Sequence, residues 1–371
     1  MRKLRCARHL AAATAAAALL FAGTAGTAAT ATAGTAGTAT TRQATRPAAA
    51  KPALTVGVNL YVTQNYPLAQ AQAYGQRDLK YIAQTLGLHA IAICWDYNVP
   101  GLHANTVTAS KTLTPSIAVI QALTSIAKSY GLKVSYRAVF AISGSNDRTQ
   151  SIDPTNMKNW IASLLKTETP ALKLAQAEHV SSFVAGTEMA SIDGSPLWKQ
   201  FFASAAKLYK GTLSYATWGG RPAVGGFFGS KTWPKPPTSL IGVTAYPSVK
   251  LPPTASVASL TKAWVSFLEF QPAEVLHRTA IDEVGIPALD GAYADPWQWI
   301  SPKGTPNPAI QANWFGAACR AAGTAGVSAL YFWAVNLVDD PAHPYQSPVK
   351  FEANAAAETA IRTCAAQAAA S

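Results

Sequence analysis

The chain has 371 residues and a formal net charge of +12, and apolar residues make up 49% of it. Residues 1–53 hold seven basic residues and no acidic ones, so residues 54–371 carry a balance of only +5. Because the lysines and arginines of this larger part are dispersed, the charge argues against a nucleic-acid partner. Residues 54–371 are numerous enough for one large domain.

The N-terminus has the pattern of a secretory signal peptide, which we place at residues 1–29. A basic segment, MRKLRCARH, precedes an apolar run over residues 10–23, and small residues follow. The run is shorter than the roughly 20 residues that span a bilayer, although an uncleaved anchor is the alternative. Residues 30–53 are mostly Ala, Thr and Gly, which predicts a flexible, disordered linker. We therefore expect a secreted protein without stable membrane insertion after cleavage, with one folded domain over residues 54–371.

Short apolar runs with strand character recur along this domain. They cover residues 55–61, 89–95, 133–140, 180–186, 212–218, 239–246, 278–285 and 327–335. Most are continuously apolar instead of alternating, which is typical of parallel strands buried on both faces. The runs therefore indicate the parallel sheet of an α/β protein.

Helical patterns lie between most of these runs. Leu79, Ile82, Ala83 and Leu86 recur at helical spacing, and Asp153-Pro154 is expected to begin another helix as N-cap and first-turn proline. Eight strand–helix repeats predict an α/β fold of the (β/α)8 TIM-barrel type with a single catalytic domain. An open doubly wound sheet is the alternative, but no GxGxxG motif follows the first run.

Polar and aromatic residues follow the C-terminal ends of the runs, where such barrels have their active sites. Two carboxylates, Glu188 and Glu283, end the fourth and seventh runs. The accompanying candidates for substrate binding are Asn59, Tyr61, Trp95, Asp96, Arg137, Arg148, Trp218, Tyr246, Trp297 and Trp333. Aromatic faces stack on sugar rings, and a carboxylate pair can supply the acid and the nucleophile that cleave a glycosidic bond. Trp299 also stands in the segment DPWQW, and for both Trp297 and Trp299 lining the cleft and pinning their own loop are equal alternatives.

This arrangement resembles the clan A glycoside hydrolases, whose acid/base Glu ends strand four and whose nucleophile Glu ends strand seven. Several segments are similar, in the same order, to glycoside hydrolase family 113, the endo-β-1,4-mannanases: SIDPTNMKNW (151–160), GTEM (186–189), LSYATW (213–218), LIGVTAYPS (240–248) and IDEVGIP (281–287). The resemblance implies a retaining hydrolase of a β-mannan-like polysaccharide, with Glu188 as acid/base and Glu283 as nucleophile. It also implies a hydrogen bond from Tyr246 to the nucleophile and a sugar site floored by Trp333.

The chain departs from that family beside the expected site. Asp282 stands where Thr usually precedes the nucleophile, Ile286 stands where a Tyr is usual, and Thr217-Trp218-Gly219 replaces Asn-Trp-Asp. Other β-glycans (glucan, xylan, galactan or a cell-envelope polymer) and a barrel that binds glycan without cleaving it are therefore alternatives. Asp282 also competes with Glu283 for the nucleophile role, since only one of two adjacent strand residues should point into the site.

The cysteines predict one disulfide. Cys6 belongs to the signal peptide, which leaves an odd number of cysteines in an exported protein. Cys319 and Cys364 lie in helix-like C-terminal segments and are expected to pair, with Cα atoms within about 7 Å, while Cys94 should be a buried free thiol. No Cys/His cluster has metal-ligand spacing, so we expect no metal site. We also expect that hydrolysis by two carboxylates needs no cofactor and that the protein is a monomer.

Overall fold

The computed structural model describes residues 51–143, 149–219, 240–299 and 302–370. Eight parallel strands close into a barrel in chain order, with β8 pairing back onto β1. The strands are β1 (Thr55–Val62), β2 (Ala90–Val99), β3 (Lys133–Ile142), β4 (Ser182–Thr187), β5 (Thr212–Trp218), β6 (Ile241–Thr244), β7 (Thr279–Val284) and β8 (Ala329–Asn336). The predicted (β/α)8 barrel is confirmed, and each strand falls at one of the predicted runs.

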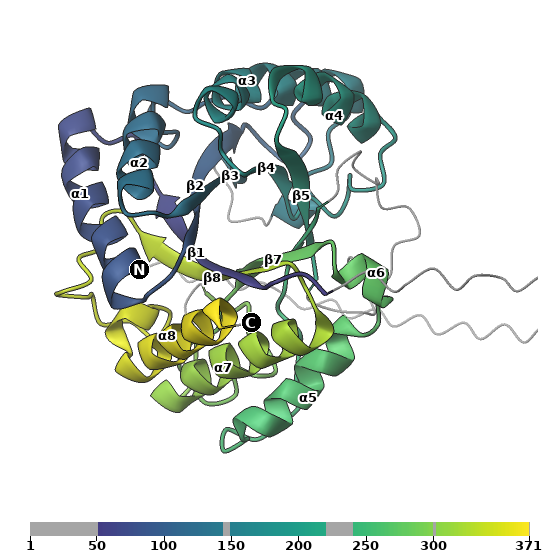
Figure 1. Cartoon of the computed structure of the whole chain (residues 1–371). Helices are drawn as coiled ribbons and strands as arrows, with labels where there is room; N and C mark the ends of the chain where they lie inside the picture. The colour runs from purple at the N-terminus through teal and green to yellow at the C-terminus, as the bar shows by residue number, and fades with distance from the viewer. Residues whose placement is uncertain (1–50, 144–148, 220–239, 300–301, 371) are drawn as a thin grey trace, which may run out of the picture. The chain divides into compact units, whose positions relative to one another are not determined.

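Helices surround the strands on the outside of the barrel (Figure 1). They are α1 (Leu68–Lys80), α2 (Ile117–Ser129), α3 (Met157–Ala177), α4 (Leu197–Leu208), α5 (Val257–Leu268), α6 (Ala273–Leu276), α7 (Pro308–Ala325) and α8 (Ala355–Ala369). Short turns of other helix types are η1 (Tyr81–Thr85), η2 (Thr149–Ser151) and η4 (Phe351–Ala353). Side-chain oxygens cap several first turns, as the free N–H groups there require; the capping residues are Ser116, Asn156, Ser256, Asn307 and Asn354.

One predicted helix start is wrong. Helix α3 begins at Met157, capped by Asn156, and not at Asp153-Pro154. The backbone N–H groups of residues 153 and 155 donate to the carbonyl groups of Leu102 and His103. These bonds to a neighbouring loop hold residues 153–156 outside the helix.

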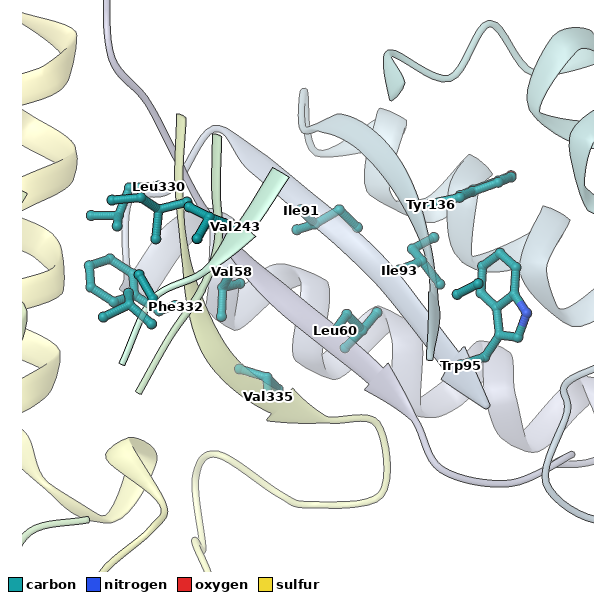
Figure 2. Close-up of a cluster of buried hydrophobic side chains, with 14 of the residues drawn as sticks. Val58, Leu60, Ile91, Ile93, Trp95, Tyr136, Val243, Leu330, Phe332 and Val335 are labelled. Carbon is teal, nitrogen blue, oxygen red and sulfur yellow. The ribbon is translucent and has the colours of Figure 1, made fainter. Parts of the chain in front are cut away.

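Strand alternation sorts the core into two layers. Large side chains such as Ile91, Ile93 and Trp95 pack outward against the helices (Figure 2). The layer inside the barrel is built mostly of small residues around one aromatic ring: Ala90, Ala92, Cys94, Ala280, Ala329 and Tyr331. Barrels of this type are usually filled by Val, Ile and Leu. Here the small residues leave a cavity of about 280 Å³ among the strand beginnings, lined by residues such as Thr55, Ser182 and Asp282.

The predicted cysteine chemistry is confirmed. Cys319 of α7 and Cys364 of α8 form a disulfide with a Cα–Cα distance of 5.8 Å, and Cys94 is a free, buried thiol. Among the described residues, none of the helices combines the length and the hydropathy needed to cross a membrane.

Candidate active site

The two carboxylates lie at the predicted strand ends. Glu188 directly follows β4, and Glu283 is the penultimate residue of β7. In a parallel barrel the ends of all strands face the same side, which we call the barrel mouth. Two residues that are far apart in the sequence therefore share one face of the molecule.

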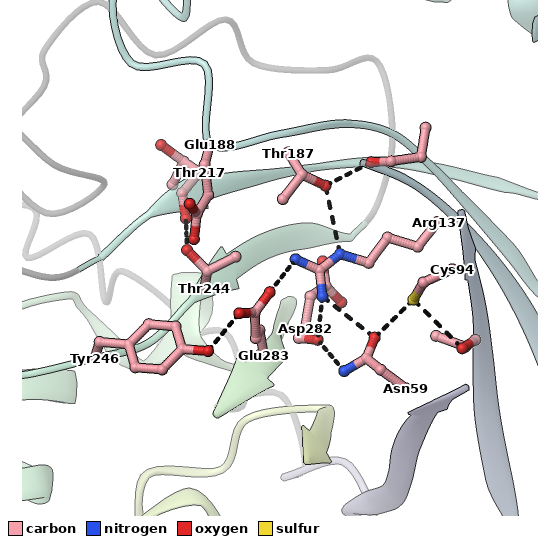
Figure 3. A network of polar contacts seen from close by, with 12 residues as sticks. Asn59, Cys94, Arg137, Thr187, Glu188, Thr217, Thr244, Tyr246, Asp282 and Glu283 are labelled. Atoms are coloured by element: carbon pink, nitrogen blue, oxygen red, sulfur yellow. Dashed lines mark hydrogen bonds and ion pairs between the residues drawn. The ribbon is translucent and has the colours of Figure 1, made fainter. Parts of the chain in front are cut away.

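Hydrogen-bond donors occupy both carboxylate oxygens of Glu283 (Figure 3). The Tyr246 hydroxyl group donates to Oε1, as predicted, and Arg137 Nη2 donates to Oε2 at 2.6 Å. Burial and the nearby Glu283 charge raise the pKa of Tyr246 well above its usual value, so Tyr246 stays a donor. Charge-assisted bonds of this kind stabilise and orient a carboxylate.

Arg137 is the centre of this network. Its side chain is only 1% exposed, and its Nη1 donates to Asn59 Oδ1 at 3.2 Å and to the Asp282 carbonyl oxygen at 2.9 Å. The guanidinium group also lies over the Trp333 ring, 5.4 Å from its centroid. Burial alone would lower the pKa of Arg137, but the Glu283 charge raises it above its usual value. Arg137 therefore brings a permanent positive charge beneath the carboxylate.

Two predicted substrate residues lie beneath the site instead of at its surface. Asn59 is fully buried, and its Nδ2 donates to the carbonyl oxygens of Asp282 and Phe332. Asn59 Oδ1 accepts from Arg137 and from Cys94 Sγ. The polar atoms of Asn59 and Arg137 are thus hydrogen-bonded to other protein groups. The prediction that these two residues bind substrate is therefore corrected, because they support Glu283 from below.

The side chain of Asp282 points away from this network. It lines the cavity at the strand beginnings, and its Oδ2 has no hydrogen-bond partner among the described residues. Burial raises the pKa of Asp282 to about 7. Gly242 makes room for this carboxyl group, since a Cβ atom there would lie 2.2 Å from Oδ2. Of the two adjacent acidic residues, Glu283 is therefore the one that meets Tyr246 and Arg137.

Glu188 is held from two directions. Its backbone N–H donates to the Ala216 carbonyl of β5 at 2.8 Å, and its Oε2 accepts from Gln150 Nε2 at 2.6 Å. The Gln150 carbonyl in turn accepts from both the N–H and the hydroxyl group of Ser191. Sequence reasoning missed Gln150, whose only signal was its place directly before the family-like segment 151–160.

Three partly exposed tryptophans, Trp218, Trp297 and Trp299, gather around the buried Tyr246 at the mouth. Trp218 stacks on Tyr246 with ring centroids 5.8 Å apart, and Trp297 meets Trp218 edge-on at 6.0 Å. Trp299, for which lining the cleft and pinning its own loop were equal alternatives, meets Tyr246 edge-on at 6.0 Å. The contact with Trp218 places Trp297 among the mouth aromatics. The set offers the apolar faces that sugar rings stack against.

A second aromatic and acidic group lies on the β1, β2 and β8 side. Tyr61 packs against Trp333 with centroids 5.1 Å apart, and its hydroxyl group donates to Asp96 Oδ2 at 2.6 Å. Burial raises the pKa of Asp96, although the bond from Tyr61 opposes this shift. Trp95, in contrast, is completely buried among Tyr97, Tyr136 and Phe183. The prediction for Trp95 is wrong, because alternation along β2 turns Cys94 and Asp96 inward and Trp95 toward the helices.

The remaining expectations concern the family departures, Arg148 and metals. Of the positions that depart from the family pattern, Thr217, Ile286 and Asp282 are buried. Arg148 lies outside the described residues. Within the described ranges, no group of three or more His, Cys, Asp or Glu residues is arranged to hold a metal ion.

Comparisons with known proteins agree with this arrangement. The model of Glycoside Hydrolase Family 113 matches residues 64–342. Similar solved structures include a complex of a GH113 β-1,4-mannanase, with a TM-score of 0.71 and 16% identity, covering 85% of this chain and 99% of that one. Another is the GH113 β-mannanase AaManA from Alicyclobacillus acidocaldarius in complex with ManMIm, with a TM-score of 0.67 and 16% identity, covering 84% and 96%.

A GH5_18 protein from Streptomyces cattleya in complex with GlcNAc is more distant, with a TM-score of 0.57 and 14% identity, covering 86% of this chain and 81% of that one. No curated protein matches the chain. At these identities the structural likeness establishes the shared fold. Because the family model spans most of the sequence, the chain belongs to glycoside hydrolase family 113.

Proposed function

We propose that the protein is a secreted, retaining glycoside hydrolase that cleaves a β-linked polysaccharide by double displacement. The observation that carries this proposal is the placement of Glu283 at the end of β7, with donors from Tyr246 and Arg137 on its two oxygens. A carboxylate that is buried, oriented and charge-compensated in this way suits a nucleophile. Glu188, at the end of β4, is the matching acid/base.

In the first step, the protonated Glu188 gives its proton to the glycosidic oxygen while Glu283 attacks the anomeric carbon. The bond to the leaving sugar breaks, and an ester joins the glycosyl group to Glu283. In the second step, Glu188 takes a proton from water, the water oxygen attacks the anomeric carbon, and Glu283 is released. Two inversions give net retention, and direct attack requires carboxyl groups roughly 5–5.5 Å apart.

A β-mannan is the first substrate to test, since the similar family 113 structures are described as β-1,4-mannanases. The aromatic residues at the mouth suit any polymer of pyranose rings. Hydrolysis of glucan, xylan, galactan or an envelope polymer by the same mechanism is therefore the alternative. The wild-type chain and Glu283→Gln should be compared on a panel of these polysaccharides with a reducing-end assay.

Release of reducing ends by the wild type alone supports the proposal and names the polymer. Binding of a polysaccharide without release by either variant would instead indicate a glycan-binding barrel. Secretion rests on the residues at the N-terminus. Expression in an export-competent bacterium should give extracellular protein whose first residue, measured by mass spectrometry, follows position 29 closely.

A further inference from the structure

Glu188 has a backbone conformation that needs external support. Its φ angle is +58°, in the left-handed region that residues with a side chain rarely adopt. Such a conformation persists only when surrounding contacts hold it. The next residue, Met189, is fully buried, and its N–H donates to the Tyr215 hydroxyl oxygen at 3.2 Å. Together with the Glu188 N–H bond to Ala216, two consecutive amide groups are attached to β5.

Tyr215 continues this attachment to a buried carboxylate. Its hydroxyl group accepts from Met189 and donates to Asp193 Oδ1, while Thr217 Oγ1 donates to Asp193 Oδ2 at 2.8 Å. Burial and the Asp193 charge raise the pKa of Tyr215 well above its usual value, so the hydroxyl group keeps its proton. The result is a chain of hydrogen bonds from the turn at Glu188 through β5 and back to the same loop.

Packing fixes the tyrosine ring in place. A Cβ atom at Gly186 would lie 2.6 Å from the ring, so the ring occupies the space that a side chain there would need. Trp198 of α4 meets the ring edge-on, with centroids 4.9 Å apart. The Tyr215 hydroxyl group therefore cannot follow the turn if the turn relaxes, which makes it a rigid anchor.

We propose that Tyr215 and Asp193 are positioning residues that hold Glu188 in its left-handed conformation and so aim its carboxyl group at the glycosidic oxygen. This inference rests on the proposed acid/base role of Glu188. Without the hydroxyl group, the buried N–H of Met189 loses its acceptor, and the turn at Glu188 loses one of its two amide attachments to β5. Among the described residues, the hydrogen bonds to the Glu283 carboxylate come from Tyr246 and Arg137, so the nucleophile should stay in place.

Because Glu188 should be misplaced while Glu283 stays in place, the variants should lose proton donation but keep nucleophilic attack. Proton donation matters for a poor leaving group and hardly matters for a very good one. Aryl β-mannobiosides, with leaving groups from 2,4-dinitrophenol to phenol, should be compared for Tyr215→Phe and wild type. We expect kcat/KM to fall roughly 10-fold to 100-fold for the phenyl glycoside and to change by less than about 3-fold for the dinitrophenyl glycoside. Asp193→Asn should act in the same direction.

Tyr209→Phe is the matched control. Tyr209 is also buried, and its hydroxyl group donates to the Val180 carbonyl oxygen at 2.6 Å, outside the loop that carries Glu188. Its loss removes one buried hydrogen bond without touching the turn. We expect the same dependence on the leaving group as in the wild type. Equal profiles for Tyr215→Phe and Tyr209→Phe would overturn the inference.

Three further variants complete the test. Glu188→Ala must itself show the steep leaving-group dependence; if it does not, the proposed function fails and the positioning role fails with it. If Glu188→Ala is steep and Tyr215→Phe is not, only the positioning role fails. Should Tyr215→Phe not fold, Thr217→Val and Thr217→Ser replace it: the first removes a donor to Asp193 and should steepen the profile, while the second keeps the hydroxyl group and should match the wild type.

Discussion

The hydroxyl group of Tyr246, which follows β6, donates a hydrogen bond to Glu283 Oε1 of β7, so two neighbouring segments of the barrel meet at the proposed nucleophile. Tyr246 also belongs to the aromatic residues at the mouth, because its ring stacks on Trp218. The same side chain thus orients the carboxylate and shapes the mouth above it.

Tyr246→Phe should separate these two roles. The ring and its stacking stay, but Glu283 loses a charge-assisted hydrogen bond worth about 1.5–3 kcal/mol. We expect kcat/KM to fall roughly 10-fold to 100-fold, mainly through kcat. Steady-state kinetics on the active polysaccharide or an aryl glycoside measure this. Tyr331→Phe, which removes a hydroxyl group near Ser135 inside the barrel, is the control and should change kcat by less than about 3-fold.

Azide rescue should assign the two carboxylates. Glu283→Ala should lose nearly all hydrolysis of an activated β-glycoside, and added azide should restore turnover and give the α-glycosyl azide, because azide then attacks from the vacated face. Glu188→Ala should give the β-azide, since its glycosyl-enzyme still forms. Proton NMR of the products reads the anomeric configuration. The same product from both variants would mean that the roles of Glu188 and Glu283 are not those proposed.

The disulfide between α7 and α8 should contribute to stability without affecting catalysis. The two cysteines are 45 positions apart, and closing a loop of this length stabilises the native state by about 4 kcal/mol on the chain-entropy estimate. We expect Cys319→Ser/Cys364→Ser to unfold at lower urea concentration and to keep wild-type kcat at 25 °C. Unreduced mature protein in denaturant should show one titratable thiol, from Cys94. An unchanged urea midpoint would contradict this prediction.

Asp282 should make stability depend on pH. Burial raises its pKa to about 7, whereas an unfolded chain releases this proton near pH 4. Between these values the native state binds the extra proton, so the free energy of unfolding falls as the pH rises from about 4 to about 7 and then levels off. Asp282→Asn should reduce the fall in the free energy of unfolding between about pH 4 and pH 7 by up to about 4 kcal/mol.

Urea titrations at several pH values measure the slope. A wild-type slope in Asp282→Asn would show that this carboxyl group does not hold a proton in the native state.

Much of the fold was predictable because its signals are local. Eight apolar runs separated by helical patterns define the barrel, and the positions of Glu188 and Glu283 at the ends of runs four and seven define the pair. The orientation of individual side chains was not predictable in the same way. Residues 90–95 (AIAICW) are apolar at every position, so they carry no alternation of apolar and polar residues that would tell whether Cys94 or Trp95 faces inward.

The supporting contacts were also out of reach because they join distant positions. Gln150, which follows β3, donates a hydrogen bond to Glu188, which follows β4. Asp193, between β4 and α4, accepts a hydrogen bond from Tyr215 of β5. The start of α3 was missed for a similar reason, since its upstream amide groups are bonded to the loop at residues 102–103. A proline inside a helix, Pro170 of α3, shows again that packing outweighs local preference.

Arg137 joins four strands at one point, through Asn59 of β1, Thr187 of β4, Glu283 of β7 and the Trp333 ring of β8. All of these contacts lie below the mouth, whereas Trp297 and Trp299 belong to the segment after β7. The residues around Arg137 thus come from the strands, whereas Trp297 and Trp299 come from a segment outside the strands that reaches the site through Tyr246. Exchanging residues 290–299 between relatives should therefore change which polysaccharide is preferred, while the contacts between Arg137 and Glu283 stay the same.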